Sequence, residues 1–107
     1  MKSENIRVLY KQAGKTMREK TIPNTLEECQ KLVGGPIEVV ALMPDVFLIC
    51  NEEGRIRGLE PNPFAGRMFV GDWFICGSQG INFSSVPRAY VKIVKQFMTI
   101  RKEGEDA

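Results

Sequence analysis

One apolar run, Trp73-Phe74-Ile75-Cys76, constrains the fold of this chain more than any other segment. It lies between two turn-forming stretches, Gly71-Asp72 and Gly77-Ser78-Gln79-Gly80. A short, fully apolar run with turn residues on both sides is typical of a central strand. We therefore expect a β-sheet built around residues 73–76, with residues 77–80 in a loop.

The other strand signals are short runs joined by turns, which favours antiparallel pairing. Residues 6–11 alternate apolar and polar side chains, and after a turn at residues 13–15 the segment 17–22 can return as the second strand of a hairpin. Residues 81–83 can add a last short strand. A meander with a left-handed turn at Gly54 is also expected, and its strands are residues 37–42, 46–50 and 55–59.

The first predicted helix has clear start and stop signals. Thr25 is the expected N-cap, and Glu28, three residues later, completes a capping box. Gly34-Gly35 ends the helix, because glycine adopts a left-handed backbone at little steric cost. Four apolar residues share one face of this helix: Leu26, Cys29, Leu32 and Val33.

A second, amphipathic helix is predicted near the C-terminus, with Ser85 as its N-cap and Pro87 in its first turn. Between the two helices, Asn62 can cap a short helical turn over residues 63–69. The apolar stripe of the C-terminal helix recurs at three- and four-residue spacing, at Val86, Tyr90, Ile93, Val94, Phe97 and Ile100.

These elements predict an α+β fold. We expect a small antiparallel sheet of about five strands, with one short central helix and one C-terminal amphipathic helix packed on it. The 107 residues suffice for one domain, which we place at residues 1–102, followed by a polar tail at residues 103–107.

Cysteine usage and hydropathy bear on where such a domain works. The three cysteines, Cys29, Cys50 and Cys76, lie in apolar surroundings and form no C-x-x-C pair. Free, buried thiols are typical of a reducing compartment. The sequence contains no signal-peptide core and no apolar run long enough to span a bilayer. We therefore expect a cytoplasmic protein that does not act in a membrane.

The chain contains no histidine. This excludes Ser–His and Cys–His nucleophile pairs and removes the commonest general base. Three cysteines cannot complete a four-thiolate zinc site, so we expect no metal and no cofactor. Acid–base catalysis by paired carboxylates stays open as an alternative, with four non-adjacent candidates: Glu38, Asp45, Glu60 and Asp72. Our hypothesis is that the protein is not an enzyme.

The charges are unevenly distributed, which directs attention to binding. Residues 1–20 carry a net charge of +4, residues 21–86 of −4 and residues 87–107 of +2. A basic face on the C-terminal helix is one candidate surface for an acidic protein or for nucleic-acid phosphates, and it comprises Arg88, Lys92, Lys95, Arg101 and Lys102. A solvated helix face is the competing interpretation.

A secondary candidate surface lies at the predicted N-terminal hairpin, whose basic residues widen the basic face if the two lie together: Lys11, Lys15, Arg18 and Lys20. Phe64, between Pro63 and Ala65 in a loop-like stretch, is a candidate exposed anchor for a partner. A protein partner is our leading expectation and nucleic acid the alternative, while the sequence leaves the oligomeric state open.

Several segments follow one another in an order that resembles a known family. They are a helix, a Gly-Gly stop, a strand and an Asn-x-x-Gly turn, followed by scattered turn residues: Thr25-Leu26-Glu27-Glu28, Leu32-Val33-Gly34-Gly35, Ile37-Glu38-Val39-Val40, Asn51-Glu52-Glu53-Gly54, Gly58-Leu59, Pro61-Asn62, Ala65, Gly71-Asp72 and Gly77. The pattern resembles the domain of unknown function 3846, over roughly residues 6–86. The C-terminal helix lies mostly outside it.

The resemblance implies a context rather than an activity. Members of that family occur in phages, plasmids and conjugative elements, and in gut-type Gram-positive bacteria, often beside counter-defence genes. The family has no established enzyme activity and no catalytic residues to carry over. We therefore expect a non-enzymatic accessory protein of a phage or mobile element that binds a protein and inhibits a host defence system, much as anti-CRISPR proteins do.

Overall fold

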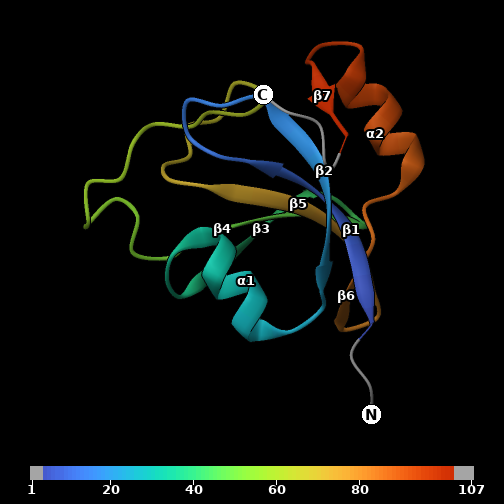
Figure 1. The fold of residues 1–107 in the computed structure, drawn as a ribbon, viewed down its shortest axis with the longest axis horizontal. Coiled ribbons are helices and arrows are strands. Elements are labelled where there is room, and N and C mark those ends of the chain that lie inside the picture. The colour runs from blue at the N-terminus through green and yellow to red at the C-terminus, as the bar shows by residue number, and fades with distance from the viewer. Residues whose placement is uncertain (1–3, 103–107) are drawn as a thin grey trace.

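The computed structural model describes residues 4–102 and confirms the α+β class (Figure 1). The predicted polar tail at residues 103–107 lies outside the described residues. The described part contains seven strands and two helices, so the sheet is larger than predicted. In chain order the elements are β1 (Asn5–Lys11), β2 (Met17–Pro23), α1 (Leu26–Val33), β3 (Ile37–Met43), β4 (Val46–Asn51), β5 (Trp73–Gln79), β6 (Asn82–Ser84), α2 (Arg88–Lys95) and β7 (Ile100–Arg101).

The sheet has the strand order β3-β4-β5-β1-β2-β7, and β6 pairs with the end of β5. The apolar run at residues 73–76 is central, as predicted, because β4 pairs with β5 on one side and β1 on the other. The prediction of a loop over residues 77–80 was wrong in part, since β5 continues to Gln79 and turns only at Gly80. The pairing of β7 with β2 is parallel, so the sheet is not wholly antiparallel.

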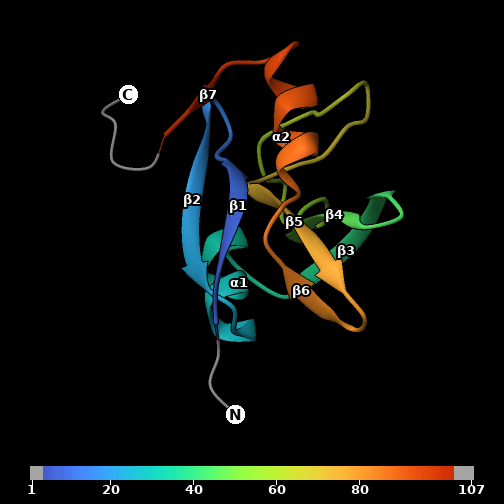
Figure 2. The same cartoon turned by 90° about the vertical axis from the view of Figure 1, so that its right-hand side faces the viewer.

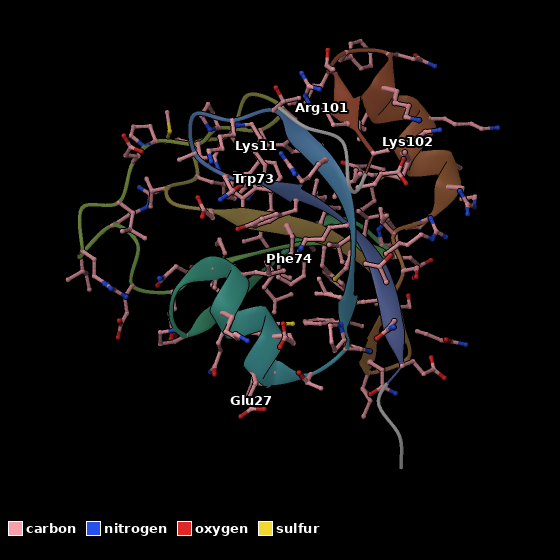
Figure 3. All side chains as sticks on the ribbon, viewed as in Figure 1. Lys11, Glu27, Trp73, Phe74, Arg101 and Lys102 are labelled. Atoms are coloured by element: carbon pink, nitrogen blue, oxygen red, sulfur yellow. The ribbon has the colours of Figure 1, made fainter. Side chains whose placement is uncertain are left out.

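Both faces of the sheet are covered, which explains why β5 is apolar throughout its first half. Successive side chains of a strand point to opposite faces, and Trp73 and Phe74 are both fully buried on different sides (Figure 3). Helix α1 covers the Phe74 face with Cys29 and Val33. Helix α2 and the long segment 52–72 cover the Trp73 face (Figure 2).

Helix α1 begins and ends as predicted. The Glu28 amide donates to the Thr25 hydroxyl at 3.2 Å, and Gly34 ends the helix with φ 81°. Only half of the predicted capping box forms, because the Thr25 amide donates to the Pro23 carbonyl and the Glu28 carboxylate pairs with Lys31. Leu26, placed on the apolar face by the sequence pattern, is exposed.

The segment 52–72 departs most from prediction. Residues 55–59 are a succession of turns instead of a strand, since the Leu59 amide bonds back to the Gly54 carbonyl at 3.0 Å. The left-handed backbone that the sequence predicted at Gly54 occurs at Gly58 instead, with φ 68°. Gly54 is required for space, because a Cβ there would lie 2.7 Å from Cγ2 of Val70.

The predicted helical turn over residues 63–69 is absent from the described structure. Its place is taken by a tight turn in which the amide and carbonyl of Phe64 bond the carbonyl and amide of Arg67, both at 2.9 Å. Asn62 is therefore not a helix cap. Its buried side chain instead donates to the carbonyl oxygens of Lys11 and Gly71, at 3.0 and 2.9 Å.

The C-terminal helix is shorter than predicted and starts differently. Its N-cap is Pro87 without a side-chain cap, and the Ser85 hydroxyl instead accepts a hydrogen bond from the Arg7 amide at 2.9 Å. The helix ends at Lys95, and Ile100 pairs with Met17 as the first residue of β7. The apolar stripe expected to run through Ile100 is therefore interrupted by a turn.

Candidate binding surfaces

The structure places three of the five predicted basic residues on α2. Arg88, Lys92 and Lys95 are exposed, whereas Val91 and Val94 of the same helix are buried. Lys95 lies 3.8 Å from the Glu19 carboxylate of β2, so part of its charge is compensated. Arg88 and Lys92 thus form the basic part of this helix that is turned to solvent.

Arg101 and Lys102 are not on the helix, because the chain has by then turned into β7 (Figure 3). The register of β2 with β7 sets Arg18 opposite Arg101. The N-terminal hairpin and the C-terminal segment are therefore neighbours. This is the condition under which the basic residues of the hairpin widen the basic surface. Lys15 is exposed at the turn of that hairpin, and Lys20 is half-buried on β2.

Lys11 has a structural position instead. Its ammonium group donates to the Asn62 side-chain oxygen at 2.9 Å and to the Gln12 carbonyl at 3.1 Å. Burial lowers the pKa of this ammonium group, against the opposing effect of the Asp72 carboxylate. Lys11 therefore holds the segment 52–72 against β1. We do not count it as part of the basic binding surface.

Phe64 is not an exposed anchor, and that prediction was wrong. Only 5% of the residue is exposed, and its ring meets Trp73 edge to face with centroids 5.3 Å apart. The segment 52–72 folds back over the sheet and carries Phe64 into the core. The exposed aromatic residue is Phe97, which is 80% exposed just beyond α2.

Phe97 lies in an apolar groove between α2 and the turn at residues 63–65. The groove encloses about 520 Å³ and is lined by Pro63, Phe64, Ala65, Tyr90, Ile93, Val94, Phe97 and Met98. Ile93 is 48% exposed on the helix side. The sequence predicted that Phe97 and Ile93 lie on a stripe covered by the sheet. In the structure Phe97 lies beyond the end of α2, and Ile93 lies on a side of α2 that stays half exposed.

The opposite wall of the groove is held in an unfavourable backbone conformation. Ala65 has φ 52° and Gly66 has φ 78°, the two left-handed residues of a tight turn. A left-handed alanine costs roughly 1 kcal/mol. Such strained residues are concentrated at ligand-binding positions, where the surrounding structure imposes them. The turn therefore presents a fixed wall to the groove.

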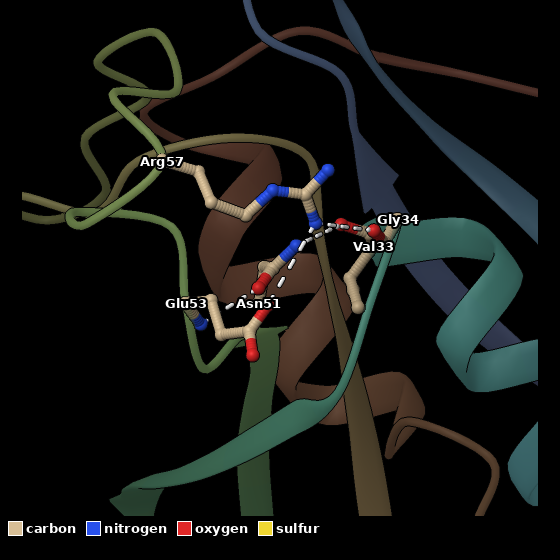
Figure 4. A network of polar contacts seen from close by, with 5 residues as sticks. All are labelled: Val33, Gly34, Asn51, Glu53 and Arg57. Atoms are coloured by element: carbon tan, nitrogen blue, oxygen red, sulfur yellow. Dashed lines mark hydrogen bonds and ion pairs between the residues drawn. The ribbon is translucent and has the colours of Figure 1, made fainter.

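A second, polar cavity of about 360 Å³ lies between the end of α1 and the segment 52–72. Its polar groups bind one another. The Asn51 amide group donates to the Val33 carbonyl at 3.1 Å and accepts from the Glu53 amide at 2.7 Å, while Arg57 donates to the Gly34 carbonyl at 3.1 Å (Figure 4). Asn51 and Gly34, which belong to the segments that resemble the family, therefore help to hold the segment 52–72 on the end of α1.

Tyr10 and Asp72 line the other end of this polar cavity. Asp72 accepts a hydrogen bond from the Ala13 amide at 2.9 Å. Burial, and then the nearby Asp72 carboxylate, raises the pKa of Tyr10 to about 12. A phenol with such a pKa stays protonated at neutral pH and is a poor general base.

The candidate carboxylates are distributed over the molecule. Glu60 and Asp72 line the polar cavity, Glu38 lines a separate cavity beneath the segment 52–72, and Asp45 lies in the β3–β4 turn. Within residues 4–102 no three groups of the metal-ligating types gather at one point. Of the four candidates, Glu60 and Asp72 are therefore the two that line the same cavity.

All three thiols are free and buried, as predicted. Burial raises the pKa of each of them, to about 11 for Cys50 and about 12 for Cys76. A thiol with a raised pKa forms little thiolate, which is the nucleophilic form. The cysteines therefore serve as small apolar residues of the core.

The family model of the domain of unknown function (DUF3846) matches residues 6–99, and the chain belongs to this family. The match runs further than the sequence resemblance suggested, since it includes α2 and Phe97. The groove is thus part of the family domain and not an addition to it. No curated protein and no solved structure matches the chain. No helix among residues 4–102 is long and apolar enough to cross a membrane.

Proposed function

We propose that this domain is a non-enzymatic, cytoplasmic binding protein that holds a partner protein in the groove between α2 and the turn at residues 63–65. The observation that supports this proposal most is the exposure of Phe97, at 80%, beside an apolar groove of about 520 Å³. Aromatic residues, phenylalanine included, are enriched at protein interfaces, where a few well-packed residues supply most of the binding energy.

Basic residues of the two elements that form the groove favour an acidic partner. Helix α2 carries Arg88 and Lys92 on its outer side, and Arg67 ends the turn that forms the opposite wall. Residues 87–102 contain no acid. A segment that supplies apolar side chains to the groove and acidic ones to its margins therefore fits best, because rim charges accelerate encounter and reject partners of like charge.

The biological role in the proposal comes from the family context. Small binding proteins of phages and mobile elements can act as inhibitors by occupying a surface that a host protein needs. We propose that the partner is a component of a host defence system, which the domain inhibits by such occupation. This role needs no catalytic group in the inhibitor, in keeping with the absence of histidine.

The first test captures partners from a Gram-positive host lysate with the wild-type domain and with Phe97→Ser. We expect a protein held by the wild type to be reduced at least about tenfold with the variant, because loss of a central aromatic anchor costs about 2 kcal/mol or more. Quantitative mass spectrometry of the captured proteins provides the measurement.

Ile81→Ser is the matched control. Ile81 is a fully exposed apolar residue in the β5–β6 turn, outside the groove. The Ile81→Ser variant should capture the same proteins as the wild type. Equal capture by the wild type and by Phe97→Ser would contradict the proposal, as would equal losses with Phe97→Ser and Ile81→Ser.

Nucleic acid is the second candidate partner, and the pairing of Arg18 with Arg101 beside α2 favours it. If it is the partner, binding to a DNA duplex or an RNA should weaken steeply with salt, and Arg88→Glu with Lys92→Glu should reduce both affinity and salt slope. The control is Lys31→Glu, which changes an exposed lysine of α1. Absence of binding at low salt in a fluorescence anisotropy titration would exclude this candidate.

A further inference from the structure

Strand β3 forms an edge of the sheet that lacks the usual protection. Among the described residues it pairs with β4 alone. Its sequence, Ile37–Met43, contains no lysine, arginine or proline and a single acid, Glu38. Native proteins normally protect such edges with charges, proline or a covering segment. By contrast, β2 near the opposite edge carries three consecutive charged residues and is partly covered by β7.

Along β3, residues whose backbone amide and carbonyl bond β4 alternate with residues whose backbone groups point away from β4. The Glu52 amide donates to the Pro36 carbonyl at 2.7 Å, which fixes the phase of the β3–β4 ladder. In an antiparallel pair every second residue bonds the neighbouring strand and the others point away. Glu38 and Val40 therefore bond β4, whereas the amide and carbonyl groups of Ile37, Val39 and Ala41 point outward.

The side chains at this edge are apolar and partly uncovered. Val39 is 47% exposed, and Ala41 is exposed on the same face of the sheet. Ala41 lies opposite half-buried Phe47 of β4. A strand added at this edge would remove apolar surface from water as well as bond the outward backbone groups. Figure 2 shows β3 at the margin of the sheet, away from α2.

We propose that β3 pairs antiparallel with β3 of a second copy of this chain, around a two-fold axis at Val39, to form one sheet across two molecules. Val39 then lies opposite the same residue of the second copy, and Ile37 lies opposite the second copy's Ala41. The three outward residues of each strand exchange about six backbone hydrogen bonds.

In this register β3 is complementary to a second β3 strand, which is why we propose a second copy of the chain as the partner at this edge. The one charge of β3, on Glu38, falls opposite the second copy's Val40, so no like charges meet directly across the junction. The irregularity between Ala41 and Met43 ends the regular pairing, which confines the junction to residues 37–41. This surface is separate from the α2 groove, so the dimer does not depend on the proposed function.

The test combines sedimentation equilibrium with residue-resolved amide exchange by NMR, from micromolar to millimolar protein. We expect a monomer–dimer equilibrium. The amides of Val39 and Ala41 should exchange at least about tenfold more slowly at high concentration, because they become bonded in the dimer. The amides of Glu38 and Val40 should be protected at both concentrations, since they bond β4.

Val39→Lys should weaken dimerisation at least about tenfold, because it sets two ammonium groups opposite each other at the axis. Ala41→Lys tests the same edge in case the first variant folds poorly. Ile81→Lys, a fully exposed site elsewhere, should dimerise as the wild type does. A monomer at every concentration would overturn the proposal. So would a dimer that is lost with Phe97→Ser but retained with both β3 variants.

Discussion

Replacing Phe74 by alanine is expected to lower the free energy of unfolding by about 4 kcal/mol, whereas Phe97→Ala should change it by less than about 0.5 kcal/mol. Phe74 is fully buried between β1 and β4 on the α1 face, and its removal leaves a cavity that the sheet cannot close. Phe97 is mostly in water already. Urea unfolding followed by circular dichroism measures both.

The contrast separates residues that stabilise the fold from a residue that serves binding. Phe97 differs from a singly exposed apolar residue because it is part of a contiguous apolar groove, and contiguous apolar patches mark interaction sites. A loss of more than about 2 kcal/mol in Phe97→Ala would mean that the residue is part of the core after all. That result would contradict the groove as an open surface.

Asn62→Ala is expected to lower the free energy of unfolding by about 3 kcal/mol, although it removes only an amide group. The Asn62 side chain satisfies the carbonyls of Lys11 and Gly71 and accepts from the Lys11 ammonium, all in a buried position. Its main-chain oxygen also accepts the Trp73 indole N–H at 2.6 Å. Alanine removes these three buried side-chain hydrogen bonds at once, and each of them contributes about 0.5–1.5 kcal/mol, or more where a charged group takes part.

Asn82→Ala provides the control for that measurement. Asn82 is exposed on β6, and its replacement should change the free energy of unfolding by less than about 0.5 kcal/mol. Equal unfolding midpoints for Asn62→Ala and Asn82→Ala would contradict the structural role of Asn62. The side-chain hydrogen bonds of Asn62 would then contribute little to holding the segment 52–72 on the sheet.

Local signals were sufficient to predict both helices and the strands β1 to β6, but not β7. Thr25 and Gly34 bound α1 because a hydroxyl cap and a left-handed glycine act within a few residues of themselves. The alternation in residues 6–11 and the apolar run at 73–76 similarly predicted β1 and β5. These features need no knowledge of distant parts of the chain.

The features that define the candidate site depend on distant contacts, and the sequence could not predict them. The position of Phe64 between Pro63 and Ala65 predicted an exposed residue. In the structure Asn62 is bonded to Lys11 and Gly71, and Phe64 packs on Trp73. The apolar spacing beyond Lys95 continues a helical pattern, yet Ile100 pairs with β2 and the helix ends early. Phe97 lies between the end of α2 and β7 and is exposed.

If the groove between α2 and the turn at residues 63–65 holds a protein partner, an NMR titration of the ¹⁵N-labelled domain with the protein captured by the wild type should show it. We expect the largest chemical-shift changes at Phe64 and Ala65 on one wall and at Ile93 and Phe97 on the other. Changes confined to the polar cavity around Tyr10, with the groove unaffected, would contradict the proposal.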